Sequence, residues 1–154
     1  VAERLRPYAD LAADHDVILA AEAHVGQEMD TPEKARWLVD TVDHPNLRLN
    51  FDYSHFLMLD IDLQHSLDLN ADCSVHTHIK DGSMIDGNVQ FALPGDDRLD
   101  LVDYLQRVKA SGLDVPITVE VSAQIWRGEN YDPWETAAHC YEKLDEARET
   151  VSGE

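Results

Sequence analysis

Short apolar runs alternate with amphipathic segments along the whole chain. Four runs, at residues 17–22, 46–52, 73–81 and 116–122, have the β-branched or alternating character of strands in a sheet. Segments 1–16, 30–45, 62–71, 99–112 and 132–148 carry apolar residues at helical spacing. This alternation of strands with amphipathic helices predicts parallel βα units rather than a sandwich or a helix bundle.

Start and stop signals support several of these helices. Thr31 is a predicted N-cap with Pro32 at the first helical position, and Asp132 with Glu135 forms a pattern similar to a capping box. Gly112 is the predicted C-terminal stop of the helix before the fourth strand. In the first helix, Pro7 fits best in the first turn.

Residues 82–97 form the longest stretch without a helix or strand pattern. The stretch follows the third strand directly, so we predict a long loop there. Loops of this length in a small domain are often functional, although a mobile flap without a role in binding substrate would have the same sequence pattern. Trp37 and Trp134 occupy helical stripes and are predicted to lie in the core.

One face of every predicted strand ends in a polar residue. Because side chains alternate between the two faces of a strand, the opposite faces carry the apolar residues that pack against helices. The carboxyl ends of parallel strands share one rim of a sheet or barrel, where active sites form. The polar side chains expected to meet at this rim are Glu22, Asp52, His78 and Glu120.

Composition narrows the class of protein. The chain has 154 residues and no linker composition, which predicts a single structural region over residues 1–154. Its two cysteines, Cys73 and Cys140, are far apart and outside any CxxC motif, so we expect a reducing, cytoplasmic location. No apolar run has the length of a membrane span, and no membrane association is expected. A formal charge of −19 argues against nucleic acid as a partner.

Three carboxylates brought together at one rim would repel one another strongly. The usual remedies are raised pKa values or a bound cation, and oxygen ligands with one imidazole suit a hard or borderline divalent ion. We therefore predict a divalent metal site, with manganese, magnesium, cobalt or zinc as the ion. Such an ion would hold a substrate carbonyl and acidify the adjacent C–H bond. Each carboxylate taken alone also fits a helix cap or a solvated loop residue.

The histidine-rich stretch "HTHIKDG" and two further histidines have alternative interpretations. His24 and His55 lie just beyond the first two strands, where each alone fits an ordinary hydrogen-bonded histidine as well as a functional one. His76 lies one layer deeper than the rim and is interpreted as structural. Lys80 and Asp81 form either an ion pair at the strand end or a contact to substrate, and the sequence leaves both alternatives open.

Taken together, these segments resemble one family. The matching pieces are "LAAEAHVG", "NFDYSHF", "HTHIKDG", "LPGDDRLDLVDYLQRVKASGLDVPITVEVS" and "YDPWETAAHCYEKL". In order and spacing they resemble the sugar phosphate isomerase/epimerase superfamily, whose members are xylose isomerase-like TIM barrels. It includes ketose 3-epimerases, hydroxypyruvate isomerases, inosose dehydratases and the endonuclease IV branch.

The resemblance implies a role for each matching residue. In the epimerase branch the equivalents of Glu22, Asp52, His78 and Glu120 bind a divalent metal, usually manganese. By the same resemblance, Glu22 and Glu120 also exchange the proton of the reacting carbon. The implied contacts to substrate hydroxyls come from His55, Glu28 and His24. One position departs from the epimerase pattern, because Met84 stands where the epimerases have a substrate-binding arginine.

The extent of the match is also informative. A complete (β/α)8 barrel needs about 250 residues and eight strands, whereas four strands are predicted here, and they resemble the last four of the family. The resemblance thus implies an α/β fold that is the C-terminal half of a TIM barrel. Such a half would expose edge strands and an apolar inner face, so we expect it to pair with a missing N-terminal half or to form a homo-oligomer.

The leading functional prediction is a sugar or sugar phosphate isomerase or epimerase that moves a proton next to a carbonyl of a small polyhydroxy substrate. An inosose-type dehydratase of the same fold would use much the same residues. A half-barrel that only binds metal is the non-enzymatic alternative. An endonuclease IV-like phosphodiesterase fits less well, because it would need a basic groove.

Overall fold

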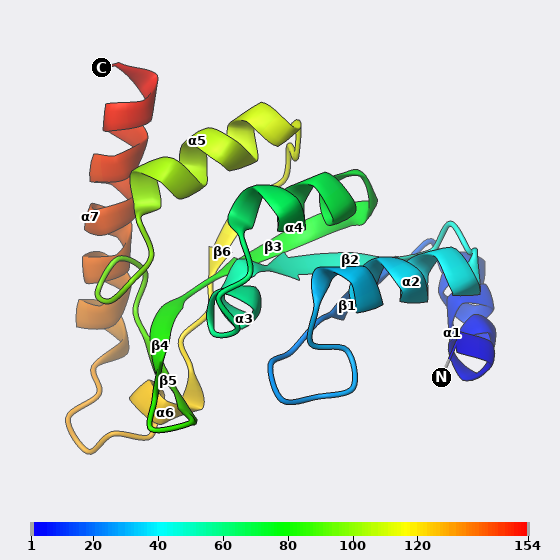
Figure 1. The fold of residues 1–154 in the computed structure, drawn as a ribbon, viewed down its shortest axis with the longest axis horizontal. Coiled ribbons are helices and arrows are strands. Elements are labelled where there is room, and N and C mark those ends of the chain that lie inside the picture. Colours follow the sequence, from blue (N-terminus) through cyan, green and yellow to red (C-terminus); the bar gives the residue numbers. More distant parts are fainter. Residues whose placement is uncertain (1, 154) are drawn as a thin grey trace.

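The computed structural model describes residues 2–153 and contains a parallel sheet of four strands. The strands are β1 (Leu19–Glu22), β2 (Leu47–Asp52), β3 (Ser74–Ile79) and β6 (Ile117–Val119), which lie side by side in that order (Figure 1). All four predicted strands are therefore present, each shorter than its apolar run. Their parallel order confirms the predicted βα units.

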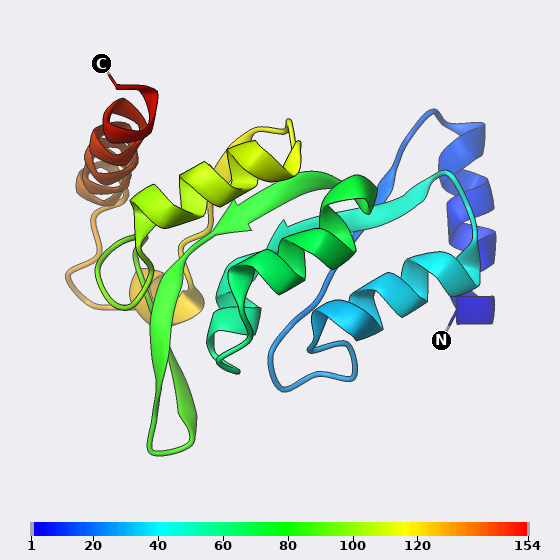
Figure 2. The same ribbon diagram turned by 45° about the horizontal axis from the view of Figure 1, so that its top comes forward.

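The helices cover one face of the sheet. Figure 2 shows α2 (Pro32–Val42), α4 (Leu63–Asn70) and α5 (Leu101–Ser111) lying side by side in front of the strands. The helices α1 (Ala2–Asp14) and α7 (Pro133–Ser152) pack on α2 and α5 at opposite ends of the molecule (Figure 1). Short helical segments complete the fold: α3 (Tyr53–Leu57), η1 (Ala71–Cys73) and α6 (Ala123–Trp126). Among residues 2–153, no helix is both long and apolar enough to cross a membrane.

The predicted caps explain where the helices begin and end. The Thr31 side chain accepts from the backbone N–H of Lys34, and Asp132 accepts from the N–H groups of residues 134 and 135. Gly112 ends α5 in the left-handed conformation, at φ 77°. Pro7 was expected in a first turn but lies inside α1, so that prediction is wrong.

The main core lies between the sheet and its covering helices. Its apolar side chains come from the helices and from the strand faces that point toward them, and burial of this surface is the main stabilising contribution. The largest fully buried side chains of this layer include Phe51, Phe56, Leu67, Ile79 and Tyr104. A smaller cluster joins α1 to α2 and the start of β2.

Tyr104 carries a buried hydroxyl that has no hydrogen-bond partner among the described residues. Burial also raises its pKa far above the ordinary value, so the phenol stays neutral. We expect Tyr104→Phe to leave the free energy of unfolding unchanged or to raise it by about 1 kcal/mol, because an unsatisfied polar group is removed. Tyr104→Ala should instead lower it by about 3–5 kcal/mol through the cavity it leaves. Urea unfolding of both variants tests this, and a clear loss of stability in Tyr104→Phe would contradict it.

The predicted loop at residues 82–97 is mostly a β-hairpin, so that prediction is wrong. Strands β4 (Asp81–Ile85) and β5 (Asn88–Ala92) pair in antiparallel fashion around a two-residue turn. Both turn residues have positive φ, 49° at Asp86 and 76° at Gly87, which is the conformation of a type I′ hairpin turn. Figure 1 shows the hairpin projecting beyond the end of β3, away from the covering helices.

Two predictions about apolar surface are also corrected. Trp37 and Trp134 are 57% and 83% exposed instead of lying in the core. The open face of the sheet is polar rather than apolar, because it carries Arg48, His76 and Thr118. In the described residues β1 and β6 are edge strands, and an apolar groove of about 870 Å³ separates β6 from α7.

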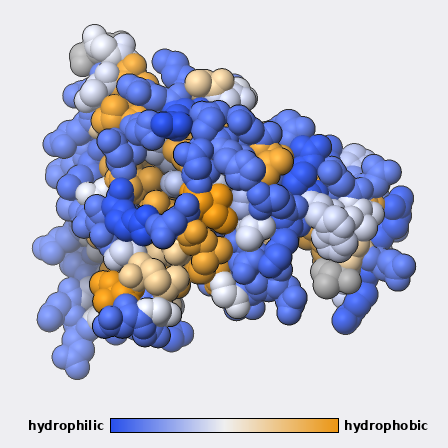
Figure 3. Space-filling view, viewed as in Figure 1, coloured by the Kyte–Doolittle hydropathy of each residue, from blue (hydrophilic) through white to orange (hydrophobic). Residues whose placement is uncertain are grey.

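Most of the surface is hydrophilic, as the charge of −19 leads one to expect. Figure 3 shows apolar patches surrounded by this hydrophilic surface on the face seen in Figure 1. The exposed apolar side chains include several at the ends of the molecule, on α1 and α7, where no further element of the described chain covers them. These residues are Tyr8, Leu11, Trp134 and Tyr141.

Candidate active site

The four predicted residues meet at the carboxyl rim of the sheet because successive strands are staggered. Asp52 pairs with His78 across β2 and β3, whereas Glu22 pairs with Asn50, two residues before Asp52. Glu120 follows the last strand, and its backbone N–H still donates to Ile79 O at 3.0 Å. The stagger therefore brings side chains from both edges of the sheet to one place, as in a barrel.

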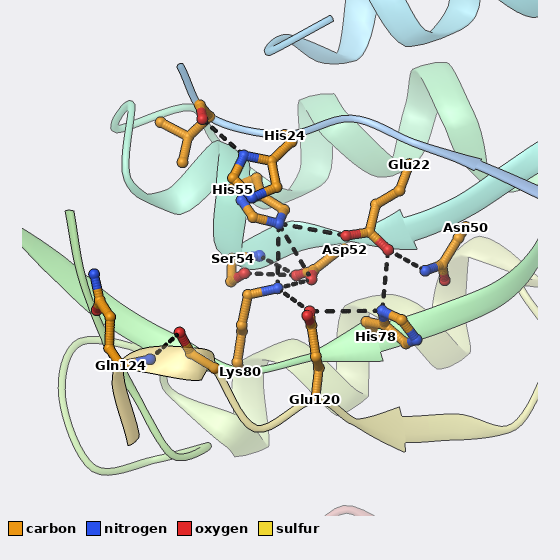
Figure 4. Close-up of polar contacts among 12 residues, drawn as sticks. Glu22, His24, Asn50, Asp52, Ser54, His55, His78, Lys80, Glu120 and Gln124 are labelled. Atoms are coloured by element: carbon orange, nitrogen blue, oxygen red, sulfur yellow. Dashed lines mark hydrogen bonds and ion pairs between the residues drawn. The ribbon is translucent and has the colours of Figure 1, made fainter. Parts of the chain in front are cut away.

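The centre of the rim is a group of carboxylates around a histidine (Figure 4). One ligand atom each from Glu22, Asp52, His55 and Glu120 lies within 4.8 Å of the other three. His55 belongs to this group although the sequence pointed to His78 as the metal ligand. His78 is adjacent, with Nδ1 at 3.0 Å from Glu22 Oε2 and 3.6 Å from Glu120 Oε2. We refer to these five residues as the rim cluster.

Asp52 is fixed by the local structure at the end of β2. It caps α3, and its Oδ1 accepts from the Ser54 backbone N–H at 3.0 Å and from the Ser54 hydroxyl at 2.6 Å. Its other oxygen accepts from Lys80. The capping turn also returns the chain over the rim, which places His55, three residues later, against the carboxylates. His55 Nε2 lies 3.4 Å from Glu22 Oε1.

Glu22 is held by a chain of polar side chains that runs along the open face of the sheet. Asn50 donates to Glu22 Oε2, and His76 Nδ1 lies 3.1 Å from Asn50 Oδ1. This arrangement agrees with the structural interpretation of His76. Burial acts to raise the pKa of Glu22, but His55, Lys80 and His78 outweigh it, so the pKa lies below the ordinary value. Glu22 is therefore a carboxylate at neutral pH.

Lys80, whose role the sequence left open, lies against the rim cluster. Its side chain is 2% exposed, and its ammonium donates to both Asp52 Oδ2 and Glu120 Oε2. Nζ also lies 3.2 Å from His55 Nε2. Burial disfavours the ammonium, but the charges and hydrogen bonds of the two carboxylates prevail and raise the pKa of Lys80. Of the two alternatives for Lys80, the structure shows an ion pair, with these carboxylates rather than with Asp81.

Asp81 holds the backbone next to the site. Its fully buried carboxylate accepts from the backbone N–H groups of Gly82, Asp97, Arg98 and Leu99 at 2.7–3.1 Å. It therefore ties the start of the hairpin to the segment that leads into α5. Gly82 has φ 147°, and a Cβ atom there would overlap the carbonyl oxygen of Gln90 in β5.

The hairpin forms one wall of the site through Phe91. The Phe91 ring meets the His55 ring edge-on, with centroids 5.4 Å apart, and the Lys80 ammonium lies 5.1 Å from its centroid. Gln124 on α6 fixes this strand, because it accepts from Phe91 N at 2.8 Å and donates to Val89 O at 2.9 Å. The face of the aromatic ring thus stabilises the same ammonium that contacts the rim cluster.

The other two predicted substrate contacts lie in the segment after β1. The His24 ring lies against the His55 ring, with centroids 4.0 Å apart and the ring planes tilted by 34°, and His24 Nδ1 is 2.8 Å from Val25 O. Glu28 is exposed and is not part of the rim cluster. His24 therefore borders the site, while the role of Glu28 stays a prediction.

The residues present fit a divalent cation. Three carboxylates and imidazole nitrogen form a donor set that suits manganese, magnesium or zinc. In addition, His78 Nδ1 is buried without a hydrogen-bond partner among the described residues, although it faces the Glu22 carboxylate. Orphaned buried nitrogens are rare in native sites. A cation bound by both Glu22 and His78 would give this nitrogen a partner.

Comparison with known proteins identifies the family. A family model described as xylose isomerase-like TIM barrel matches residues 1–144. The chain belongs to the xylose isomerase-like TIM-barrel family. Inosose dehydratase of Lactiplantibacillus plantarum is 27% identical to this xylose isomerase-like chain in an alignment 137 positions long, which covers 78% of this chain and 45% of the dehydratase.

Solved structures show the same fold. The 3-keto-D-glucoside 4-epimerase from E. coli superposes with a TM-score of 0.73 at 22% identity, covering 96% of this chain and 52% of the epimerase. A D-psicose 3-epimerase gives 0.75 at 15% identity, covering 97% of this chain and 55% of the other. This xylose isomerase-like chain thus spans about half the length of the relatives it matches, which confirms the expected half-barrel.

Proposed function

We propose that the chain carries the metal-binding and proton-transfer residues of an isomerase or epimerase that acts next to a carbonyl of a small polyhydroxy compound. The observation that supports it is the convergence of Glu22, Asp52, His55 and Glu120 to within 4.8 Å at the carboxyl rim of the sheet. The enzymes named among its relatives act on sugars and related compounds and include epimerases and a dehydratase.

The proposed roles follow from position and ionisation. Glu22 and Glu120 come from opposite edges of the sheet, so they can approach a substrate from two sides. Glu22 is ionised at neutral pH and can therefore accept a proton, and Glu120 returns one to the other side of the same carbon. A metal held by Glu22, Asp52, Glu120 and a histidine, for which we propose manganese, would polarise the carbonyl and so acidify that C–H bond.

The charge of the site favours a neutral substrate. Three carboxylates of the rim cluster face one ammonium, that of Lys80, and the chain as a whole carries −19. A phosphorylated substrate or a nucleic acid would be repelled by this surface. We therefore propose an unphosphorylated sugar or cyclic polyol as substrate, and not the phosphodiester substrate of an endonuclease.

A dehydratase is the second candidate. It is favoured by the 27% identity to inosose dehydratase. The first step would be the same proton abstraction by one glutamate, after which the second glutamate would protonate a departing hydroxyl instead of the carbon.

Two buried free cysteines, Cys73 and Cys140, support the further proposal of a cytoplasmic location.

We also propose that a further polypeptide segment, or a second copy of this chain, completes the pocket. The sheet has four of the eight strands of a closed barrel, and its edges at β1 and β6 have no second neighbour among the described residues. Either an N-terminal half-barrel or a second copy of the chain would cover them. Light scattering of the purified chain, with and without an added N-terminal half-barrel, measures which complex forms.

Solvent exchange tests the proposed reaction. The manganese-loaded protein, in its completed form, is incubated in D₂O with a panel of unphosphorylated ketoses and inososes and followed by NMR. An epimerase or isomerase incorporates deuterium next to the carbonyl without loss of water, whereas a dehydratase releases water and forms an enone or its tautomer. The proposal would be overturned if the protein binds manganese but catalyses neither deuterium exchange nor dehydration of any of these compounds.

A further inference from the structure

The ammonium of Lys80 lies where a bound cation would lie. It contacts three of the four residues whose ligand atoms lie within 4.8 Å of one another, namely Asp52, Glu120 and His55 (Figure 4). The side chain enters from the residue directly after β3, which shares a face with His76 and His78. No other lysine or arginine of the described residues forms an ion pair with a rim-cluster carboxylate.

We propose that Lys80 is a positioning residue that acts as the internal cation of the site, holding Asp52 and Glu120 together until a divalent metal takes its place. This inference rests on the proposed metal site and adds a residue to it. Metal binding then becomes an exchange of one cation for another rather than the filling of a vacant site.

A cation offsets the mutual repulsion of the carboxylates in the rim cluster. Without a cation, the carboxylates of Glu22, Asp52 and Glu120 would repel one another in a largely buried place, and the rim would open. A divalent ion coordinated by the same oxygens would in turn repel the ammonium. Two positive charges a few ångströms apart in a poorly solvated site cannot both be stabilised by the same carboxylate oxygens.

The surroundings of Lys80 allow such an exchange. Asp81 fixes the backbone immediately after the lysine through its four hydrogen bonds, so the main chain stays in place. The four-carbon side chain can still turn, and the Phe91 ring, 5.1 Å from Nζ, offers a face on which an ammonium is stabilised. The displaced ammonium would remain beside the substrate, where it can donate to a hydroxyl or carbonyl oxygen.

Substitution of Lys80 by methionine tests this inference. The metal-free Lys80→Met protein should melt at a lower temperature than the wild type, because the carboxylates lose their counter-ion. Its affinity for Mn²⁺ should rise by at least about tenfold, because the competing cation is gone and the site is more negative. Titration calorimetry and the melting temperature with and without Mn²⁺ are the readouts. Lys143→Met, at a half-exposed lysine on α7, is the matched control and should change neither.

The outcomes separate this inference from the proposed function. Equal or weaker Mn²⁺ binding by Lys80→Met would overturn the cation exchange, even if the wild type binds the metal. If the wild type does not bind Mn²⁺ but Lys80→Met does, the exchange holds and the native metal dependence fails. If Lys80→Met does not fold, Lys80→Gln takes its place, because glutamine keeps a hydrogen-bond donor without the charge. Lys80→Gln should also bind Mn²⁺ more tightly than the wild type. Equal or weaker Mn²⁺ binding by Lys80→Gln would overturn the inference.

Discussion

Replacing Glu120 with glutamine is expected to lower the rate of proton exchange beside the substrate carbonyl by about 10²–10⁴-fold, the usual contribution of a general acid or base. Glutamine has nearly the same shape but neither accepts nor returns a proton at neutral pH. The Glu120 side chain is 39% exposed, so the substitution should leave the core intact. Deuterium uptake measured by NMR at saturating Mn²⁺ gives the rate, and saturation separates lost proton transfer from weaker metal binding.

The matched control is Glu142→Gln, at an exposed glutamate of α7 outside the rim cluster, which should exchange at the wild-type rate. Glu22→Gln should lose as much activity as Glu120→Gln if the two glutamates act on opposite sides of one carbon. Exchange in Glu120→Gln at more than about one tenth of the wild-type rate would exclude Glu120 as an acid or base.

Asp81→Ala is expected to lower the free energy of unfolding by about 3–5 kcal/mol, because each buried donor left without a partner costs about 1–3 kcal/mol. Four backbone N–H groups lose their acceptor, two of them fully buried and two partly accessible to water. Urea unfolding followed by circular dichroism measures the change. The hairpin should also detach, which hydrogen exchange of β4 and β5 would show.

Asp81→Asn serves as the matched variant. Asparagine retains one carbonyl oxygen, which can still accept from Gly82, Arg98 and Leu99, while its amide group faces the N–H of Asp97. The loss should therefore be smaller, about 1–2 kcal/mol. A loss below about 1 kcal/mol in Asp81→Ala would show that the carboxylate does not organise this part of the chain.

The order of strands and helices could be predicted from the sequence because each element carries its own periodicity and caps. Thr31 with Pro32, and Asp132 with Pro133, mark helix starts that depend only on local hydrogen bonds. The convergence of Glu22, Asp52, His78 and Glu120 followed from the alternation of faces and from the shared rim of parallel strands.

The missed hairpin did carry a local signal. Asp86 and Gly87 form the Asp-Gly pair that favours type I′ turns, and Ile85 and Val89 flank it. The strand propensity of the residues around this turn is weak, because Gly82, Ser83 and Gln90 are poor strand formers. The pairing of β4 with β5 and the four bonds of Asp81 supply what the sequence pattern lacks.

The place of Lys80 was also open to prediction. Residue 80 shares a strand face with His76 and His78, so simple alternation points its side chain into the site. The exposure of Trp37 and Trp134, in contrast, depends on which neighbours reach their helices. Both residues lie on helices as expected, but α7 packs mainly on α5 and leaves Trp134 outside the contact. Helix spacing alone does not define which face is covered.

We propose that the rim cluster binds one divalent metal ion. Because the chain has 31 acidic residues, this specific binding has to be distinguished from nonspecific binding of cations. Titration with Mn²⁺, followed by calorimetry or by the EPR signal of free Mn²⁺, compares the wild type with Glu22→Gln and Glu142→Gln. We predict one tight ion per chain in the wild type and in Glu142→Gln. Affinity in Glu22→Gln should fall by at least about 100-fold, since outer-shell partners alone are worth about 10–100-fold. Several weak ions bound equally by all three proteins would contradict the account.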